Sequence, residues 1–346
     1  MRYDYLVLIG RFQPFHNGHL TVLRHALRLA DKVIVLVGSA GQPRTTRNPF
    51  NAGERAVMIR AAAGDEAGRL IVQPLRDRLY NETVWVADVQ RLVAETLEAD
   101  GAGPETKVGL IGRDKDGATG AYLAAFPQWP LVDVQHTDVL SATELRAWLF
   151  SGEAGALRLV EANTPPAVFE MLEAFRAGSP AYAQLAREDA FMRAYRQSWA
   201  AAPYAPTFVT ADAVLVHSGH VLLVRRRAEP GKGLWALPGG FVNQDETVQA
   251  AAMRELQEET RVKLPPAVLR GSIKARQVFD YPGRSLRGRT ITHAFHFDFP
   301  TGDLPKVRAA DDADRVRWVP LSEAMLMEEQ FFEDHFHILE HFVGGA

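Results

Sequence analysis

Short apolar runs and amphipathic runs alternate through the first half of the chain. The apolar runs include YLVLI, VIVLV and KVGLIG, and the amphipathic runs include LTVLRHALRLA and VWVADVQRLVAETL. Apolar runs of about five residues are typical of strands buried on both faces, and intervening helices place such strands in parallel. After Gly18, apolar residues recur at three- and four-residue spacing, which predicts a helix with one buried face. We therefore expect an α/β domain built on a parallel sheet.

A second domain is expected in the last part of the chain. The alternation breaks near NTPP (163–166) and GSP (178–180), and AYAQLAREDAFMRAYRQSWA predicts a connecting helix. The later segment DAVLVHSGHVLLVRR holds two alternating runs joined by Ser-Gly, the pattern of a β-hairpin. With 346 residues the chain is long enough for two cores. The expected boundaries are 1–178 for the first domain, 179–205 for a linker helix and 206–346 for the second domain.

Composition excludes several functional classes. The chain has 39 Lys and Arg against 42 Asp and Glu. It therefore lacks the basic excess expected of a protein that binds nucleic acid by neutralising many phosphates, and a polynucleotide partner is not expected. It has no cysteine, which excludes disulfides, thiolate zinc sites and cysteine nucleophiles and favours a reducing cytoplasm. No apolar stretch reaches membrane-spanning length, so no membrane partner is expected. A homo-oligomer remains open.

The segment GRFQPFHNGHL places His16 and His19 between an expected strand and an expected helix. In α/β folds ligands bind at the carboxyl ends of parallel strands, where N–H groups of the next helix point at anions. A metal site and a buried structural role are the alternatives, and no acidic third ligand lies nearby in the sequence for a metal. We favour phosphate contact, with Gly18 allowing close approach and Arg11 supplying a planar guanidinium.

A second segment, SATELR, also points to phosphate. It opens an expected helix, where Ser141 or Thr143 can cap the first turn and contact phosphate, and Arg146 follows one turn later. As a capping pattern alone it is common. It indicates a phosphate site only in combination with the motif that holds His16 and His19.

The last domain carries a dense group of carboxylates on an expected helix. Glu255, Glu258 and Glu259 fall within an arc of about 100° on one helix face. Such a group is often only a solvated acidic face, here relieved by Arg254 four residues before Glu258. The preceding LPGGF favours a site instead, because glycines bring backbone carbonyls next to the carboxylates. Oxygen ligands of this kind suit Mg²⁺, with Mn²⁺ as the alternative.

The spacing from Gly240 through Glu246 to RELQEE and Val262 resembles the signature of the Nudix hydrolases over 23 residues. The resemblance implies an α/β/α fold with a mixed sheet. It implies that Glu255, Glu259, Glu258 and the Gly239 carbonyl are metal ligands, that Arg254 orients the carboxylates, and that Glu246 holds the loop. The signature glycine near the end of the helix is replaced by Arg261, which is expected to cost some stability in a left-handed turn.

Two further features of this domain remain open. The base that activates water is not identified, and the segment RAADDADRVRW offers only the candidates Asp311, Asp312 and Asp314. Arginines in FDYPGRSLRGRT could hold substrate phosphates or could simply be solvated. We assign Arg284 and Arg289 to substrate, with Arg287 as a further candidate. Among Nudix enzymes the segment looks most like ADP-ribose pyrophosphatases.

The first domain resembles the H-x-G-H nucleotidyltransferase superfamily, and within it the archaeal-type nicotinamide mononucleotide (NMN) adenylyltransferases. The motifs GRFQPFHNGH, RNPFNAGER and SATELR carry this resemblance, which implies a Rossmann-like fold. Trp85 falls where that group stacks a tryptophan on the nicotinamide ring, with a core position as the alternative. The residues assigned to catalysis or to substrate and ATP binding are Gly10, Arg11, Phe12, His16, Gly18, His19, Arg47, Asn48, Trp85, Lys115, Asp116, Ser141, Thr143 and Arg146.

Together the two resemblances imply a bifunctional enzyme with ATP, NMN and ADP-ribose as small-molecule substrates. The first domain would make NAD and pyrophosphate, and the second would hydrolyse ADP-ribose to AMP and ribose 5-phosphate. Other nucleotidyltransferase and Nudix substrates, such as NADH or sugar nucleotides, stay open, as does a sensor that binds ADP-ribose without hydrolysis. The complete set of Nudix carboxylates argues against the sensor.

Overall fold

The computed structural model describes residues 2–112, 125–134, 141–153, 155–299 and 301–344. The chain divides into two compact units, Met1–Arg187 and Glu188–Ala346.

The first unit contains a parallel sheet of five strands in the order β3-β2-β1-β4-β5. The strand order reverses between β1 and β4, since β2 and β3 lie on one side of β1 and the later strands lie on the other. A crevice at the carboxyl ends of the strands is expected at this position. The strands are β1 (Tyr3–Gly10), β2 (Ala30–Ala40), β3 (Leu70–Arg76), β4 (Val108–Gly112) and β5 (Leu131–Asp133).

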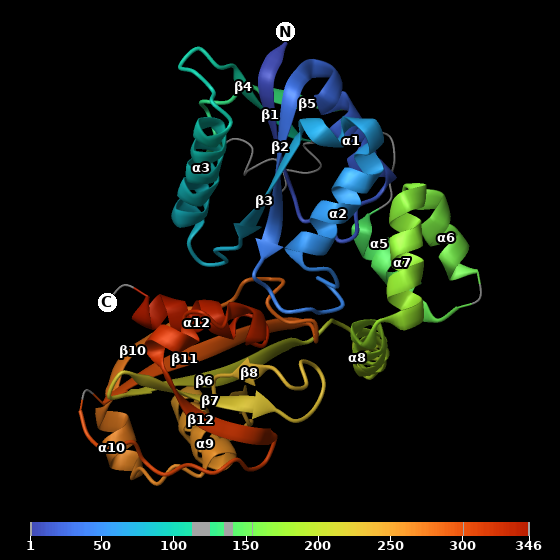
Figure 1. Cartoon of the computed structure of the whole chain (residues 1–346). Helices are drawn as coiled ribbons and strands as arrows, with labels where there is room; N and C mark the ends of the chain where they lie inside the picture. Colours follow the sequence, from blue (N-terminus) through green and yellow to red (C-terminus); the bar gives the residue numbers. More distant parts are fainter. Residues whose placement is uncertain (1, 113–124, 135–140, 154, 300, 345–346) are drawn as a thin grey trace. The chain divides into compact units, whose positions relative to one another are not determined.

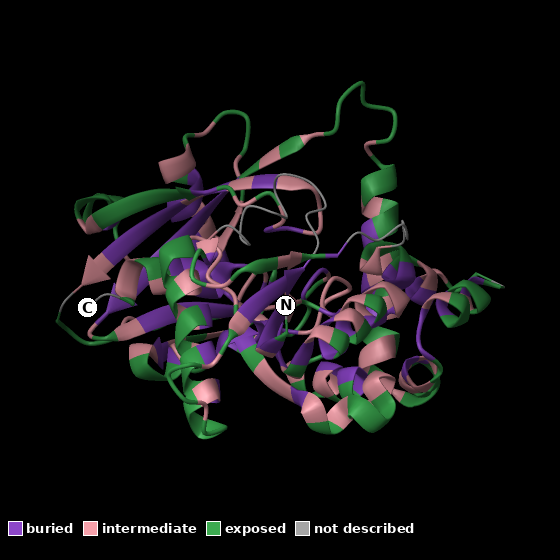
Figure 2. Ribbon diagram, turned by 90° about the horizontal axis from the view of Figure 1, so that it is seen from above, coloured by how far each residue is buried: buried purple, intermediate pink, exposed green. Residues whose placement is uncertain are grey.

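Helices cover both faces of this sheet. Leu6 and Leu8 of β1 pack into one core with residues of α1, and Tyr5 and Val7 pack into a second core with residues of α3. Figure 1 shows α3 on one side of the sheet and α1 and α2 on the other, and Figure 2 shows the strands buried between them. The helices are α1 (Asn17–Leu29), α2 (Ala52–Ala63), η1 (Gly64–Arg69), α3 (Glu82–Ala99), α5 (Ala142–Ser151), α6 (Ala156–Asn163), α7 (Pro166–Gly178) and α8 (Pro180–Gln197), which runs across the division between the units.

The second unit contains a mixed sheet. Its main path is β10-β11-β6-β7-β12, with β8 paired to β7 and β9 paired to β6. The β11–β6 pair is parallel and the remaining pairs are antiparallel. The strands are β6 (Thr207–His217), β7 (His220–Arg226), β8 (Trp235–Ala236), β9 (Gly239–Phe241), β10 (Ile273–Phe279), β11 (Arg289–Phe299) and β12 (Ala313–Pro320).

One face of the second sheet is covered by α9, whose Ala251, Ala252 and Leu256 are buried in a core with Ala213 of β6 and Phe297 of β11. Figure 1 shows α12 on the opposite face. The helices are α9 (Val248–Thr260), α10 (Pro266–Gly271), α11 (Leu321–Ala324), η3 (Glu328–Gln330) and α12 (His335–Val343).

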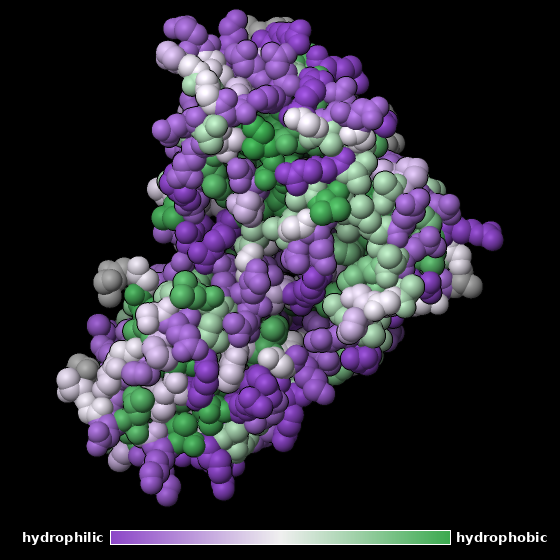
Figure 3. Space-filling model, in the orientation of Figure 1, coloured by the Kyte–Doolittle hydropathy of each residue, from purple (hydrophilic) through white to green (hydrophobic). Residues whose placement is uncertain are grey.

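The structure confirms the parallel sheet, the connecting helix and the hairpin. The hairpin pairs His217 with His220, and Ser218 and Gly219 between them both have positive φ, as its turn type requires. The break expected at NTPP is in fact the start of α7, because proline is well accommodated in the first turn of a helix. Purple, hydrophilic residues cover most of the surface seen in Figure 3. None of the helices in the described parts of the chain is long and apolar enough to cross a membrane.

Candidate active sites

His16 and His19 close the first turn of α1. His16 is the N-cap residue, and its Nδ1 accepts a hydrogen bond from the Gly18 N–H at 3.1 Å. His19 Nδ1 accepts one from the His16 N–H at 3.3 Å, and the two rings stack with centroids 3.7 Å apart. A nitrogen that accepts from a backbone N–H carries no proton, so in each neutral ring the proton is on Nε2. The cap therefore makes each Nε2–H a hydrogen-bond donor.

The residues around this turn explain its packing. A Cβ at Gly18 would lie 3.0 Å from Cε1 of His16, so a larger residue there would crowd the ring. Phe12 is buried with φ of 52°, and its ring meets His19 edge-on at 4.9 Å. Gly10 is the last residue of β1. The sequence therefore fixes the orientation of both imidazoles through local packing.

Three arginines converge near the histidine turn. Arg146 on α5 is 8% exposed and donates to the Gln13 carbonyl at 2.7 Å and to Thr143 Oγ1 at 3.1 Å. Burial, together with the smaller effect of the neighbouring charges of Arg11 and Arg47, lowers the pKa of Arg146 to about 10. Guanidinium groups repel one another at close range, so their gathering favours an anionic ligand such as a phosphate chain.

Residues that sequence reasoning did not single out hold this loop in place. Gln13 is 2% exposed, donates to the Phe50 carbonyl at 2.7 Å and accepts from the Phe50 N–H at 3.0 Å. Arg55 of α2 is 1% exposed and donates to the carbonyls of Arg11 and Gly38. Both residues lie within the quoted motifs GRFQPFHNGH and RNPFNAGER, but their partners are distant in sequence, so local spacing did not predict these contacts.

The other residues predicted to bind substrate in the first unit lie in different surroundings. Ser141 caps α5 in a reciprocal pair with Glu144, whose carboxylate accepts from the Ser141 N–H at 2.8 Å. Asn48 Oδ1 is buried and lacks a hydrogen-bond partner among the described residues. Trp85 lies in the first turn of α3, half-buried, with its ring 6.0 Å from that of Phe126. Lys115 and Asp116 lie outside the described residues.

In the second unit, Arg254 joins the acidic residues of the signature. Its guanidinium bonds to Glu246 at 2.6 Å, to Glu255 at 2.8 Å and to Glu258 at 2.9 Å. These hydrogen bonds, those to Glu246 first, raise the pKa of Arg254, and the bond from Arg254 lowers the pKa of Glu246. Glu246 also accepts from the Asn243 N–H at 2.9 Å, which fixes the loop before α9. These contacts support the orienting role of Arg254 and the loop-holding role of Glu246.

Glu259 and Glu255 lie against the two glycines of LPGGF, Gly239 and Gly240. Glu259 is 6% exposed and accepts from the Gly239 N–H at 3.2 Å. A Cβ at Gly240 would lie 2.3 Å from Oε1 of Glu255, so only glycine leaves room for that carboxylate. Burial raises the pKa of Glu259 to about 8. The turn and the helix thus bring carboxylate oxygens beside backbone of the glycine pair.

Comparisons with known proteins cover both units. The Cytidylyltransferase-like family model matches residues 7–147, and the NUDIX domain model matches residues 206–342. The nicotinamide/nicotinic acid mononucleotide adenylyltransferase of Acinetobacter baylyi is 37% identical over 187 residues, which are 53% of this chain and 92% of that protein. The crystal structure of a bifunctional NMN adenylyltransferase/ADP ribose pyrophosphatase from Francisella tularensis is 35% identical, with a TM-score of 0.91 over 99% of each chain. The chain belongs to this bifunctional family. A second Francisella tularensis structure of the same description, complexed with AMP and a manganese ion, is 34% identical over 99% of each chain, with a TM-score of 0.90.

Membership in the bifunctional NMN adenylyltransferase/ADP ribose pyrophosphatase family confirms the expected fold class. The parallel sheet belongs to the Rossmann-like first unit and the mixed sheet to the NUDIX unit. The manganese ion in the second Francisella tularensis structure is consistent with the groups present in the NUDIX unit, since carboxylate and carbonyl oxygens are suitable ligands for a divalent metal. Among the described residues, no group of three or more metal-ligating side chains is gathered around one point. Arg254 holds two of the three carboxylates, as the bonds to Glu255 and Glu258 show.

The arginines predicted to bind phosphate in the NUDIX unit have different surroundings. Arg284 is 5% exposed, and its guanidinium makes two hydrogen bonds to the buried carboxylate of Asp334, at 2.8 and 2.9 Å. Arg289 pairs with Asp280 at 3.5 Å. The guanidinium carbon of Arg287 lies 5.1 Å from the ring centroid of Phe241, which is the residue directly after the glycine pair. The three loop arginines therefore differ in burial and in their partners, and the run of basic residues in the sequence could not distinguish them.

The three aspartates proposed as candidates for the base also differ in their contacts. Asp314 makes two hydrogen bonds to Arg225, both at 2.7 Å, and its pKa is lowered by them. Burial is the main cause that raises the pKa of Glu255 and of Glu259, and the charge of Asp311 adds to the rise for Glu255 and that of Asp312 to the rise for Glu259. Asp314 is thus engaged by Arg225, whereas Asp311 and Asp312 each exert an electrostatic effect on a carboxylate of the signature.

Two buried side chains that sequence reasoning missed support the glycine turn. His335 Nδ1 accepts from the Leu237 N–H at 3.0 Å, and burial lowers the pKa of His335 to about 3, so this ring is neutral. Asp212 accepts from Thr292 Oγ1 at 2.5 Å, and burial raises its pKa to about 6. Asp212 was detectable in principle, because it is a lone carboxylate in an apolar strand.

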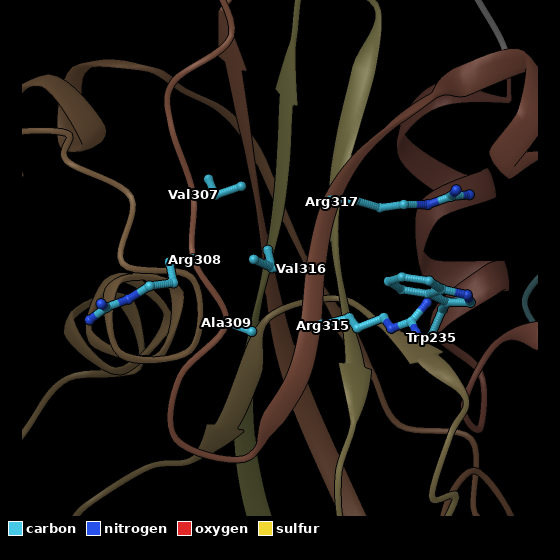
Figure 4. Close-up of a pocket in the computed structure, with 7 residues that line it drawn as sticks. All are labelled: Trp235, Val307, Arg308, Ala309, Arg315, Val316 and Arg317. Atoms are coloured by element: carbon cyan, nitrogen blue, oxygen red, sulfur yellow. The ribbon is translucent and has the colours of Figure 1, made fainter.

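A pocket of about 310 Å³ lies along β12, and none of the predicted site residues is among those that line it. Figure 4 shows Trp235 beside Arg315 and Arg317, with Val307 and Val316 facing each other and Arg308 pointing away. Its lining residues are Trp235, Val307, Arg308, Ala309, Arg315, Val316 and Arg317. None of these is a carboxylate of the signature, so we do not assign the reaction to this pocket.

Proposed function

We propose that the first unit transfers AMP from ATP to NMN, giving NAD and pyrophosphate, and that the NUDIX unit hydrolyses ADP-ribose to AMP and ribose 5-phosphate. The likeness to the Francisella tularensis bifunctional protein over 99% of each chain carries this proposal. The site geometry supports it, since each unit holds the motif residues that its reaction requires. The lack of cysteine favours a reducing cytoplasm as the setting.

In the first unit, adenylyl transfer needs positioned donors rather than a protein nucleophile. A phosphate oxygen of NMN forms a bond to the α-phosphorus of ATP as the bond to the departing pyrophosphate breaks. We assign the Nε2–H groups of His16 and His19 to the phosphate oxygens on which negative charge develops. Arg11, Arg47 and Arg146 hold the phosphates in line, which supplies much of the rate through orientation.

Recognition of the substrates involves residues around this centre. Asn48 is proposed as a ligand contact, because its buried Oδ1 is an acceptor without a partner among the described residues. Trp85 is proposed to stack on the nicotinamide ring, since an aromatic face suits a flat cationic ring. Lys115 and Asp116 are proposed to line the adenylyl pocket on the family resemblance alone.

In the NUDIX unit, we assign Glu255, Glu258, Glu259 and the Gly239 carbonyl to Mg²⁺, with Mn²⁺ as the alternative. A bound divalent ion neutralises a pyrophosphate and lowers the pKa of a coordinated water. Arg254 orients two of the carboxylates, and Asp312 or Asp311 is proposed to take the proton from the attacking water. Water adds to one phosphorus of ADP-ribose, and the bond between that phosphorus and the bridging oxygen breaks.

Product chromatography tests both assignments on one preparation. The protein is incubated with ATP, NMN and Mg²⁺, and separately with ADP-ribose and Mg²⁺. We expect NAD in the first mixture, and AMP with ribose 5-phosphate in the second. Substrates that remain intact in either mixture would refute the assignment of that unit.

A pair of variants then assigns each activity to its unit. Glu259→Gln is expected to lower ADP-ribose hydrolysis by at least about a hundredfold while NAD synthesis stays intact, because it removes one proposed metal ligand. His19→Ala is expected to do the reverse, through loss of a transition-state donor. Each variant is the folding control for the other. Unchanged hydrolysis in Glu259→Gln would refute the metal assignment.

A further inference from the structure

Arg55 makes an unusual set of contacts for a buried cation. Its side chain is 1% exposed, and the four hydrogen bonds that it makes to described residues all go to backbone carbonyls. Nη1 donates to the carbonyls of Arg11 at 2.6 Å and Gly38 at 2.5 Å, Nη2 donates to that of Ser39 at 3.3 Å, and Nε donates to that of Asn51 at 3.2 Å. No carboxylate shares in these bonds.

The carbonyls that Arg55 binds lie where two neighbouring strands end. Gly38 and Ser39 are near the carboxyl end of β2, and Arg11 directly follows β1. One planar guanidinium therefore joins the ends of both strands at the start of the histidine loop. Only arginine has several N–H groups fixed in one plane, so lysine cannot reproduce this set of bonds.

Other hydrogen bonds hold the following residues of the histidine loop. Gln13 makes two hydrogen bonds to the backbone of Phe50, which directly precedes the N-cap of α2. The carbonyl of Gln13 in turn accepts from Arg146. The backbone between Arg11 and Gln13 is thus fixed by Arg55 and Phe50 on one side and by Arg146 on the other.

The charge of Arg55 also acts on this site. Burial lowers its pKa to about 10, the carboxylate of Asp77 raises it, and the charge of Arg11 lowers it. Asp77 accepts from the Ser39 N–H at 3.0 Å, so it supports the same strand end. An anionic ligand beside Arg11 would relieve the repulsion between the two guanidinium groups.

We propose that Arg55 is a positioning residue for adenylyl transfer, acting through the backbone of Arg11 and the histidine loop without touching substrate. This inference rests on the function proposed for the first unit. Because catalytic donors must be held within a fraction of an ångström, loss of this clamp lowers the rate of transfer more than it weakens substrate binding.

The test compares Arg55→Lys with Arg60→Lys in the full chain. Arg60 lies on the same helix and is exposed, so its replacement is a matched control. We expect Arg55→Lys to lower kcat for NAD formation by about ten- to a hundredfold, with KM for ATP and NMN changed less than about threefold. ADP-ribose hydrolysis by the same preparation should stay at the parent rate, and Arg60→Lys should match the parent in both reactions.

Chemical rescue separates positioning from a folding defect. In Arg55→Ala, free guanidinium ions at low millimolar concentration should restore part of the lost kcat, whereas ammonium ions should not. An unchanged kcat in Arg55→Lys, or a rise in KM with kcat constant, would overturn the inference. If the parent itself makes no NAD, the proposed function fails. The inference rests on that function and fails with it, whereas NAD formation by the parent together with an unchanged kcat in Arg55→Lys overturns the inference alone.

Discussion

His16 and His19 show how one side chain can serve both the fold and the reaction. Each Nδ1 accepts a backbone N–H in the first turn of α1, and this contact sets which nitrogen carries the proton. The helix start therefore determines the hydrogen-bonding chemistry of both rings. Structural and catalytic contributions of His16 can be separated, because asparagine is also a strong N-cap residue but has no imidazole.

His16→Asn and His16→Ala form a matched pair for this separation. Both should lower the rate of adenylyl transfer by about a hundredfold or more, because each removes one donor to the developing charge. Only His16→Ala should also lose about 1 kcal/mol of stability with the cap. Steady-state kinetics and thermal unfolding measure the two effects. Transfer by His16→Asn within a factor of two of the parent would show that capping is the whole role of this residue.

At the scale of single elements, α9 illustrates what a sequence can predict. The glutamates and Arg254 lie within one helix and its preceding loop, so spacing alone placed them together. The same locality made Arg261 predictable. It ends α9 with φ of 52° and ψ of 25°, in the left-handed region that disfavours residues with a Cβ.

Arg261→Gly should therefore stabilise the NUDIX unit by about 1 kcal/mol, because glycine adopts this conformation without the steric cost. Arg261→Ala is the control, since it removes the long side chain but keeps the Cβ, and it should give no gain. Chemical denaturation followed by a signal from this unit measures both. A gain in the alanine variant equal to that in the glycine variant would assign the effect to the side chain and not to the backbone.

At the scale of the whole molecule, each unit holds its own set of motif residues, so the two activities are expected to be separable by mutation. What the sequence could not supply are contacts between residues far apart in the chain. The clamp from Arg55 to Arg11 and the buried pair of Arg284 and Asp334 both depend on how strands and loops meet. Local spacing predicted a basic loop around Arg284, but only the fold shows that this guanidinium is buried.

Glu188, at the start of the second unit, predicts how the stability of that unit depends on pH. It is 3% exposed, and burial raises its pKa from 4.5 to about 7, with Glu229, Glu333 and Asp189 adding to the shift and Arg226 opposing it. Below pH 4.5 the carboxyl is protonated in both the folded and unfolded states. As pH rises to 7 the unfolded state ionises first, so stability is lost over this range.

Glu188→Gln removes this loss. A shift of roughly 2.5 pKa units corresponds to about 3 kcal/mol, so the variant should exceed the parent by about that amount at pH 8 and by much less at pH 5. In a unit of this size the gain at pH 8 corresponds to roughly 6–12 °C in Tm. Calorimetry at both pH values measures it, with the exposed Glu329→Gln as control. A gain that is equal at both pH values would mean that the amide packs better and that ionisation of Glu188 does not limit stability.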